Sequence, residues 1–292
     1  MNILVTGACG QLGLTLRDLS SGYDHKCVFA DVAAGEDVVS LDVTDPKAVR
    51  EAVAGNEIDV IINCAGYTDV NRAEDEEDKA RLINAVAPAI LAEAARENGA
   101  VLIHISTDYV FDGNANTPYP EDAPKYPLGA YARTKLEGEQ AVLASGCRYI
   151  ILRTAWMYSC YGKNFFRTIV EKTAALPSIS VVNDQTGTPT YAYDLASAIF
   201  LMIDDGKLDR TGVYNYSDEG VCSWYDFAKA INRGMGHICD VRPCGTSGFP
   251  SKARRPAYSV LDKTKFKETF GYEVPHWQDS LDLCIAEYYS KA

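Results

Sequence analysis

Residues 2–13 read N-I-L-V-T-G-A-C-G-Q-L-G, an apolar run followed by three glycines and the start of an amphipathic stretch. The run is typical of a buried strand, and the stretch 11–20 is typical of a helix. Glycine permits a tight turn and a close approach of the backbone to a ligand, while a helix N-terminus offers N–H groups to a pyrophosphate. A glycine-rich turn between a first strand and a first helix therefore predicts dinucleotide binding. The alternative is a turn whose glycines serve only helix–strand packing.

The alternation of apolar runs and helical patterns continues through the first half of the chain. Further strands are predicted at 26–31, 38–42, 59–64, 100–106 and 148–154, and further helices at 46–55 and 71–98. Near-continuous apolar strands separated by helices are typical of a parallel sheet that is buried on both faces. We therefore predict an α/β fold built on a Rossmann-type doubly wound parallel sheet.

Beyond residue 154 the alternation loosens into short strands, turns and helices, with helices predicted at 191–204, 223–234 and 277–290. We assign residues 1–154 mainly to a dinucleotide-binding domain and residues 155–292 mainly to a smaller, mixed, substrate-binding lobe. Some segments of the second part are expected to return to the first sheet.

The composition is that of a soluble globular protein, because 47% of the 292 residues are hydrophobic and 23% are charged. The net charge of −12 argues against nucleic acid as a partner, since phosphate backbones are bound by basic surfaces. No apolar run approaches the roughly 20 residues that span a bilayer. The N-terminus also lacks the basic and apolar regions of a signal peptide. We expect no membrane association and a cytoplasmic location.

The nine cysteines and four histidines are dispersed, without a C-x-x-C pair or the spacing of a zinc site. This distribution predicts free thiols in a reducing compartment and no metal site. Cys64, at the end of a predicted strand, is interpreted as a packing residue rather than a nucleophile.

A candidate for chemistry lies in A-Y-A-R-T-K-L-E-G-E at 130–139. Tyr131 and Lys135 are four residues apart and therefore share one face of a helix. Upstream, I-S-T-D-Y-V-F-D-G at 105–113 follows a predicted strand, and ligands of open α/β sheets bind beyond such strand ends. For Tyr131 and Lys135 taken alone, a solvated helix face is the alternative.

The spacing G-x-x-G-x-x-G and the Tyr-x-x-x-Lys pattern together resemble the extended branch of the short-chain dehydrogenase/reductase superfamily. The resemblance implies Thr107, Tyr131 and Lys135 as catalytic residues. It also implies that NADH or NADPH contacts the glycine turn, the strand ends and the catalytic helix, at Gly7, Gly10, Gln11, Leu12, Gly13, Asp31, Asp42, Val43, Cys64, Ala65, Gly66, Tyr67, Ile105, Tyr131 and Lys135.

The chemistry of ketone reduction accounts for these residue types. The carbonyl carbon takes a hydride and its oxygen takes a proton, but a phenol with a pKa of about 10 is a poor acid–base catalyst at neutral pH. A neighbouring ammonium such as Lys135 is expected to lower the pKa of Tyr131. Lys135 is also expected to hydrogen-bond the nicotinamide ribose, and the Thr107 hydroxyl to polarise and orient the carbonyl.

Asp31 ends the second predicted strand about 20 residues after the glycine turn, where a carboxylate accepts from an adenosine ribose hydroxyl. A carboxylate there repels a 2′-phosphate, and no arginine follows it nearby. Asp31 therefore favours NADH, and use of both cofactors stays open. A strand-end aspartate that bonds to the next turn is the alternative.

Longer motifs narrow the resemblance to the dTDP-4-dehydrorhamnose reductase family. They are S-T-D-Y-V-F-D-G, Y-A-R-T-K-L-E-G-E, R-T-A-W-M-Y, N-D-Q-T-G-T-P-T and R-R-P-A-Y-S-V-L-D. That family reduces the C4 ketone of a dTDP-6-deoxysugar to dTDP-L-rhamnose with NADPH or NADH. The resemblance implies that Tyr131 protonates the C4 oxygen and that the dTDP-sugar contacts Thr107, Asp108, Trp156, Gln185, Thr188 and Arg255. Core packing of Trp156 and a surface position of Arg255 are the alternatives.

Thr15 marks a departure from this family. Some members dimerise around magnesium held by carboxylates, one of them just after the glycine turn, where this chain has Thr15 in Q-L-G-L-T-L. We therefore expect no metal requirement, and either a monomer or a homodimer that no metal bridges.

Two other classes of protein stay open. A nucleotide-sugar epimerase or dehydratase shares the tyrosine, the lysine and the glycine turn, although dehydratases follow the threonine with Asp-Glu and this chain has Asp108-Tyr109. A regulatory protein resembling the β subunit of methionine adenosyltransferase is the non-enzymatic alternative. The presence of Thr107, Tyr131 and Lys135 favours a reductase.

Overall fold

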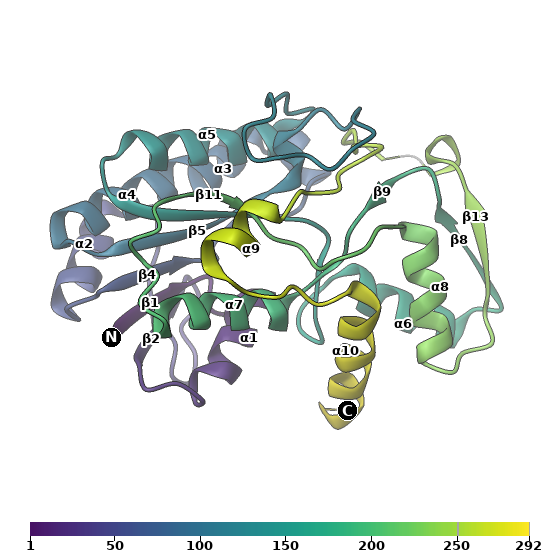
Figure 1. The fold of residues 1–292 in the computed structure, drawn as a ribbon, viewed down its shortest axis with the longest axis horizontal. Coiled ribbons are helices and arrows are strands. Elements are labelled where there is room, and N and C mark those ends of the chain that lie inside the picture. Colours follow the sequence, from purple (N-terminus) through teal and green to yellow (C-terminus); the bar gives the residue numbers. More distant parts are fainter. Residues whose placement is uncertain (250, 292) are drawn as a thin grey trace.

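The computed structural model of the protein describes residues 1–249 and 251–291. Its centre is a seven-stranded sheet in the order β11-β6-β5-β4-β1-β2-β3 (Figure 1). The strands are β1 (Asn2–Thr6), β2 (Lys26–Asp31), β3 (Val39–Ser40), β4 (Val60–Asn63), β5 (Val101–Thr107), β6 (Arg148–Thr154) and β11 (Gly212–Asn215). Each strand runs parallel to its neighbours. The predicted fold class, an α/β doubly wound parallel sheet, is confirmed.

Helices cover both faces of this sheet. On one face α1 (Gln11–Ser20) packs against α7 (Ala192–Asp204), and on the other lie α2 (Pro46–Gly55), α4 (Ala87–Asn98) and α5 (Ala130–Ala144) (Figure 1). The two-residue period of a strand explains how one strand serves both faces. In β1, Ile3 and Val5 belong to the hydrophobic core on the side of α1 and α7. Leu4 belongs to the core on the side of α2, α4 and α5.

The prediction of one helical stretch over 71–98 is wrong, because the structure divides this segment into four pieces. They are the 3₁₀ turn η1 (Arg72–Glu74), α3 (Glu77–Arg81), the π-helical turn η2 (Leu82–Val86) and α4. In the π turn, the buried Asn84 amide accepts from the Tyr67 N–H at 2.8 Å and donates to its C=O at 3.1 Å. It also donates to the Thr134 hydroxyl at 3.2 Å. These tertiary contacts override the regular helical period, and π turns are frequent at functional sites.

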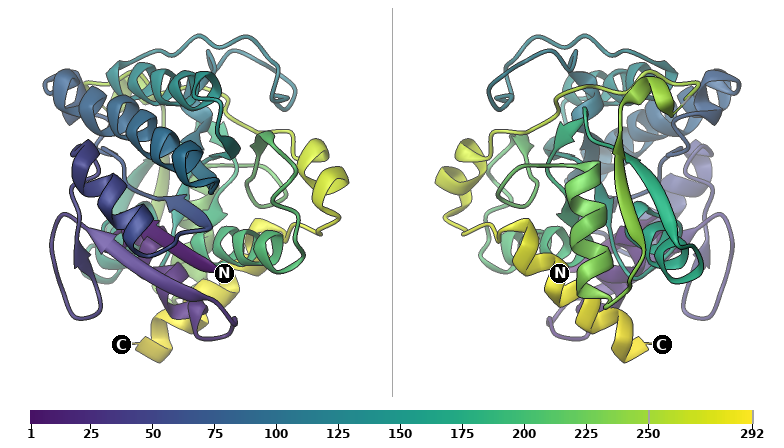
Figure 2. Two further views of the ribbon diagram at one scale, coloured as in Figure 1. Left: turned by 90° about the vertical axis from the view of Figure 1, so that its left-hand side faces the viewer. Right: turned by 90° about the vertical axis from the view of Figure 1, so that its right-hand side faces the viewer.

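A smaller group of elements follows β6. It comprises β7 (Met157–Tyr158), α6 (Phe165–Ala175), β8 (Ser178–Val182), β9 (Thr186–Gly187), β10 (Thr190–Tyr191), β12 (Cys222–Ser223), α8 (Trp224–Gly234), β13 (Asp240–Cys244), η4 (Thr246–Gly248) and α10 (Trp277–Lys291). The strands form two-stranded pairs, and an aromatic core that includes Tyr158, Phe166 and Phe227 holds the group together. The right-hand view of Figure 2 shows α8 and β13, in pale green, in front of the main sheet.

The chain crosses between the two parts more than once. After β10 it returns to the main sheet, where α7 packs on α1 and β11 pairs with β6, and α9 (Thr264–Phe270) then lies against β11. The division at residues 154 and 155 stays a prediction. Within residues 1–249 and 251–291, no helix combines the length and the apolar character that crossing a membrane requires.

Candidate active site

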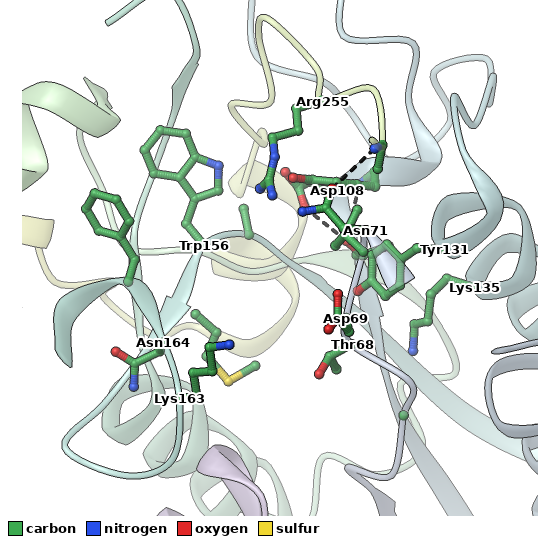
Figure 3. Close-up of a pocket in the computed structure, with 18 of the residues that line it drawn as sticks. Thr68, Asp69, Asn71, Asp108, Tyr131, Lys135, Trp156, Lys163, Asn164 and Arg255 are labelled. Carbon is green, nitrogen blue, oxygen red and sulfur yellow. Dashed lines mark hydrogen bonds between the residues drawn. The ribbon is translucent and has the colours of Figure 1, made fainter. Parts of the chain in front are cut away.

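A cleft of about 1820 Å³ runs along the carboxyl ends of β1, β4, β5 and β6 and is closed on its far side by α6, β8 and the segments 246–249 and 251–257. Typical sites for one small ligand occupy roughly 300–1,000 Å³, so this cleft has room for two. Its lining includes every predicted site residue except Tyr67 and Thr188. Figure 3 shows Tyr131 and Lys135 on one side of the cleft and Trp156 and Lys163 on the other.

The glycine turn is built so that two of its residues must lack a side chain. Gly7 has φ of +67°, and a Cβ on it would lie 2.6 Å from the Ala65 nitrogen. A Cβ on Gly13 would lie 2.3 Å from the Gly7 carbonyl oxygen. Gly10 precedes the first residue of α1, which places the helix N-terminus at the cleft. This is the geometry in which backbone N–H groups bind a pyrophosphate.

The two carboxylates near the turn have different surroundings. Asp31, at the end of β2, accepts from the Cys9 N–H at 3.0 Å, so it bonds to the turn and lines the cleft at once. Asp42 accepts from the Thr44 N–H at 2.9 Å and from its hydroxyl at 2.7 Å. These bonds stabilise the carboxylate and lower the pKa of Asp42. Val43 lies beside it in the cleft wall.

Beyond β4, Cys64, Ala65 and Gly66 lie in the cleft wall directly beside the glycine turn. Burial raises the pKa of the Cys64 thiol to about 12, although the nearby Lys135 lowers it in part. Cys64 is therefore a neutral thiol and a packing residue at neutral pH. Tyr67 points away from the cleft, where its hydroxyl donates to Glu76 at 3.0 Å.

The structure brings Thr107, Tyr131 and Lys135 together at one wall of the cleft. Thr107 is the last residue of β5, while Tyr131 and Lys135 lie on the first two turns of α5. The Thr107 hydroxyl donates to Asp108 Oδ1 at 3.0 Å. Lys135 Nζ donates to the Ile105 carbonyl at 2.6 Å. The face of α5 that carries Tyr131 and Lys135 is therefore turned into the cleft and is not a solvated helix face.

Burial dominates the protonation of these two side chains. It raises the pKa of Tyr131, which contact with the Thr107 hydroxyl lowers in part. It lowers the pKa of Lys135 to about 8, against the partial opposing influence of Glu139 and Cys64. The expected lowering of the Tyr131 pKa by Lys135 is not found in this structure. The reason is that the phenol is desolvated and the ammonium is directed at the Ile105 carbonyl.

Contacts with two segments distant in sequence hold the first and the third turn of α5 in place. Glu74 of η1 accepts from the Ala130 N–H at 2.9 Å, which places a carboxylate at the helix N-terminus. Gly138 permits close packing against the π turn, because a Cβ on it would lie 2.0 Å from the Asn84 carbonyl oxygen. The tyrosine and lysine therefore stand on a helix held at both its first and its third turn.

A buried ion pair lies behind the cleft wall that contains Thr107, Tyr131 and Lys135. Glu139 accepts from Arg153 Nε at 2.9 Å and from Arg153 Nη2 at 2.7 Å, and their side chains are 1% and 3% exposed. Glu139 also accepts from the Ser106 hydroxyl at 2.5 Å. The pair thus joins α5, β6 and the residue that precedes Thr107. Both ends of the bidentate pair are satisfied, as a buried charge requires.

Four of the predicted substrate residues line the other half of the cleft. They are Asp108, Trp156, Gln185 and Arg255. Trp156 has φ of +49°, a strained value for a bulky residue, and its indole stacks on Trp224 with ring centroids 3.5 Å apart. Burial raises the pKa of Asp108 to about 7, although a hydrogen bond from Thr107 lowers it in part. Gln185 donates to the Thr246 hydroxyl at 3.0 Å.

Thr188 lies elsewhere. It is fully buried, its hydroxyl donates to the Gly220 carbonyl at 2.7 Å, and it does not line the cleft. In the same N-D-Q-T-G-T-P-T segment Gln185 faces the cleft, because β9 and the turn that follows it direct successive side chains to different sides.

With this geometry established, the chain can be compared with known proteins. A family model described as the RmlD substrate binding domain matches residues 1–290. The chain belongs to this family. The predicted resemblance to dTDP-4-dehydrorhamnose reductases is confirmed.

Three similar proteins show how far the likeness to RmlD extends. A Streptomyces antibioticus protein described as a probable dTDP-4,6-dihydroxy-2-methyloxan-3-one 4-ketoreductase is 42% identical, over 99% of this chain and 97% of its own. A crystal structure of a Clostridium acetobutylicum dTDP-4-dehydrorhamnose reductase has a TM-score of 0.93 at 40% identity, covering 99% of this chain and 100% of that one. The Bacillus anthracis dTDP-4-dehydrorhamnose reductase in complex with NADP has a TM-score of 0.90 at 35% identity, covering 98% and 99%.

This RmlD-family cleft also contains polar side chains that the sequence alone did not single out. Thr68, Asp69 and Asn71 follow the Cys64-Ala65-Gly66 segment, and Lys163 and Asn164 precede α6 (Figure 3). Asn164 begins α6 by accepting from the Arg167 N–H at 3.0 Å, and such an Asn before a helical pattern is the one signal that was available. The others lie in irregular loops, where spacing carries no information about direction.

The charge of the cleft differs from that of the whole RmlD-family chain. Its lining includes seven basic residues (Lys79, Lys135, Lys163, Lys172, Lys252, Arg254 and Arg255) and six aspartates (Asp31, Asp42, Asp69, Asp108, Asp112 and Asp184). The chain as a whole has a net charge of −12. Basic side chains are therefore concentrated at the cleft, where a phosphorylated ligand is best attracted.

Proposed function

We propose that the protein reduces the C4 ketone of dTDP-4-dehydro-6-deoxy-L-mannose (dTDP-6-deoxy-L-lyxo-4-hexulose) to give dTDP-L-rhamnose, with NADH or NADPH as the reductant. The observation that carries the proposal is the meeting of Thr107, Tyr131 and Lys135 beside the glycine turn, in a cleft large enough for a cofactor and a sugar nucleotide. The family assignment and the dTDP-4-dehydrorhamnose reductases among its similar structures support it.

The cofactor half of the cleft fits a dinucleotide. Gly7 lets the turn pack closely on the Ala65 backbone, and Gly13 lets α1 pack closely on the turn. The N-terminus of α1 thereby adjoins the cleft. Gly10, Gln11 and Leu12 would hold the pyrophosphate and Asp31 the adenosine ribose, with further contacts at Asp42, Val43, Cys64, Ala65, Gly66 and Ile105. The bound nicotinamide supplies the hydride for the sugar carbon.

Tyr131 acts as the acid in this proposal. Because burial raises its pKa, the phenol is protonated at neutral pH, which is the form that can give a proton to the C4 oxygen. The Thr107 hydroxyl, at the end of the adjacent strand, hydrogen-bonds the same oxygen and orients the ketone. Lys135, with a pKa of about 8, remains largely charged at neutral pH and would hydrogen-bond the nicotinamide ribose.

Asp31 supports a preference for NADH. Its carboxylate lies in the cleft, where it would repel the 2′-phosphate of NADPH. Arg17 of α1 is engaged elsewhere, since Nη2 donates to the Glu36 carbonyl at 2.8 Å and lies 3.5 Å from Asp37. The Bacillus anthracis relative was crystallised with NADP, so use of both cofactors stays open.

The substrate half offers an apolar plane and a cation. The indole of Trp156, stacked on Trp224, presents a flat surface that suits the apolar face of a deoxysugar. Arg255, half-buried in the cleft wall, suits a diphosphate by its planar, bidentate geometry. Asp108 and Gln185 would contact sugar or base. Thr188, held by Gly220, would shape the segment rather than touch the substrate.

A second substrate is favoured by one comparison. The relative at 42% identity is described as acting on dTDP-4,6-dihydroxy-2-methyloxan-3-one, another dTDP-linked ketosugar. Both reactions place a hydride on C4, so the catalytic residues do not distinguish them. The substrate is instead decided by the groups that contact the remaining sugar carbons.

The proposal is tested by nicotinamide absorbance over time, with NADH and NADPH in separate runs and each of the two ketosugar nucleotides in turn. Stoichiometric oxidation with the rhamnose precursor, at a higher kcat/KM than with its rival, supports the proposal. Preference for the rival substrate would reassign the sugar but keep the reductase. Turnover of a nucleotide sugar without net oxidation would instead indicate an epimerase. No turnover at all, with co-purification of a synthetase subunit, would indicate the regulatory protein.

Oligomeric state and location follow as expectations of the same proposal. The Thr15 side chain is buried and its hydroxyl donates to the Gln11 carbonyl at 2.9 Å, so it offers no ligand to a bridging magnesium. We expect a monomer, or a homodimer without a metal bridge, in the cytoplasm. Gel filtration with and without added magnesium should give one and the same size.

A further inference from the structure

Two thiols and a carboxylate meet away from the cleft, in the smaller part of the molecule. Cys160 lies in the loop between β7 and α6, while Cys284 and Glu287 lie three residues apart on one face of α10. Cys160 Sγ is 3.8 Å from Cys284 Sγ and 3.3 Å from Glu287 Oε2, and the three donor atoms all lie within 4.8 Å of one another. Because 124 positions separate the two cysteines, no sequence spacing reveals the cluster.

The distances suit a tetrahedral zinc site. With Zn–S near 2.3 Å, two thiolates at a tetrahedral angle lie about 3.8 Å apart, and a thiolate and a carboxylate oxygen lie about 3.5 Å apart. The observed 3.8 and 3.3 Å agree with these edges. Packed thiols also touch near 3.8 Å, so the sulfur pair alone would not indicate a metal. The additional evidence is the Glu287 carboxylate oxygen, which lies within 4.8 Å of both sulfurs.

The surroundings of Glu287 are those of a ligand rather than a packing residue. The Tyr191 hydroxyl donates to Oε2, and Lys291 Nζ donates to Oε1 at 2.6 Å. Hydrogen bonds of this kind orient a ligating carboxylate. Two thiolates and the carboxylate carry three negative charges, of which a divalent cation balances two, while Lys291 contacts both Glu287 and Asp18.

Burial protects the cluster while leaving it reachable. Cys284 is fully buried and Cys160 is 9% exposed, among Tyr158, Phe166 and Tyr191 of the aromatic core. The Glu287 side chain, 23% exposed, lies on the solvent side. A metal would therefore enter past the carboxylate and be held against an apolar wall.

We propose that Cys160, Cys284 and Glu287 bind one Zn²⁺, with water in the fourth position. The site joins α10 to the loop 159–164, whose Gly162, Lys163 and Asn164 line the cleft. In that loop the Ser159 hydroxyl donates to Gln11 Oε1 at 3.2 Å, next to the glycine turn. The metal fastens the C-terminal helix to one wall of the cleft and takes no part in hydride transfer. The prediction of no metal site rested on spacing along the chain, and the cobalt titration below tests it together with this proposal.

Cobalt is the probe for this site, because thiolate coordination gives Co²⁺ a near-ultraviolet charge-transfer band and tetrahedral geometry gives intense visible bands. The full-length protein, with its thiols kept reduced by a phosphine, is titrated with Co²⁺ and then with Zn²⁺. We expect one equivalent of Co²⁺ to bind with both sets of bands, and Zn²⁺ to displace it. The variants Cys284→Ala and Glu287→Gln should bind at least ten-fold more weakly.

Cys147→Ala is the matched control, because Cys147 is an equally hidden thiol outside the cluster. It should bind Co²⁺ like the wild type, and Zn²⁺ should raise the thermal midpoint of both. Circular dichroism checks that each variant is folded. The proposal is overturned by a wild type without a charge-transfer band, by equal binding in Cys284→Ala, or by loss of binding in Cys147→Ala alone. The proposal is also overturned if the reduced protein binds no Co²⁺ and, on exposure to air, forms a Cys160–Cys284 disulfide.

Discussion

The buried ion pair of Glu139 and Arg153 should be the contact of α5 on which the stability of the protein depends most. Replacing Glu139 by Gln removes the charge and puts an amide NH₂ where Arg153 Nη2 now donates at 2.7 Å. One donor then faces another, and the Arg153 guanidinium, 3% exposed, loses its only counter-charge in the pair. Removing one partner of a buried ion pair costs about 3–5 kcal/mol of unfolding free energy.

The assay is equilibrium unfolding in urea, followed by fluorescence and circular dichroism. Glu137→Gln is the matched control, since it makes the same change two positions away on the same helix. The Glu137 pair with Arg81 is 2.9 Å long, but its side chains are 40% and 39% exposed. An exposed pair of this kind contributes roughly 0–1 kcal/mol. The reasoning is refuted if Glu139→Gln costs no more than Glu137→Gln at an unchanged m-value.

Three further predictions concern the cleft. Tyr131→Phe removes the proton donor and should lower kcat by about 10²–10⁴-fold. Its affinity for NADH, measured by fluorescence titration, should stay within a factor of two of the wild-type value. Substantial remaining turnover would show that another group donates the proton. Asp31→Ala removes the charge that repels a 2′-phosphate and should shift the ratio of kcat/KM values towards NADPH, and an unchanged ratio would remove Asp31 from the cofactor site. Asp108 has its folded pKa raised to about 7 by burial, so wild-type stability falls as pH rises from the unfolded pKa towards that value. Asp108→Asn should therefore gain roughly 2–3 kcal/mol more over wild type at about pH 8 than at about pH 5, and an equal difference at both pH values in urea unfolding would contradict the burial argument.

The parts of the fold that the sequence predicts are those with local causes. The glycine turn at residues 7–13 is readable because sterics restrict Gly7 and Gly13 to a residue without a Cβ. The buried strands are readable because both faces of β1 need apolar residues. The division of the segment 71–98 cannot be predicted from the sequence, because the π turn depends on contacts of Asn84 with Tyr67 and Thr134, which are distant in sequence.

The same distinction applies to the candidate site. Tyr131 and Lys135 could be predicted only from their motif together with the glycine turn and the Thr107 segment, and the structure places both at the cleft. The protonation state of Tyr131 could not be predicted from the sequence, because it depends on the burial of the side chain in the folded protein. Gln185 and Thr188 stand three positions apart in one motif, yet only Gln185 lines the cleft, while the Thr188 hydroxyl donates to the Gly220 carbonyl. Lys163 lies in an irregular loop and has no periodic signal.

The most direct test of the central claim, reduction at C4, is to follow the hydride itself. The protein is given dTDP-6-deoxy-L-lyxo-4-hexulose with NADH deuterated at the transferring position of the nicotinamide ring, and the product is examined by NMR. The account predicts dTDP-L-rhamnose with deuterium at C4, in one-to-one ratio with oxidised cofactor, and almost none formed by Tyr131→Phe. A product without deuterium at C4, or a changed sugar with the cofactor still reduced, would contradict it.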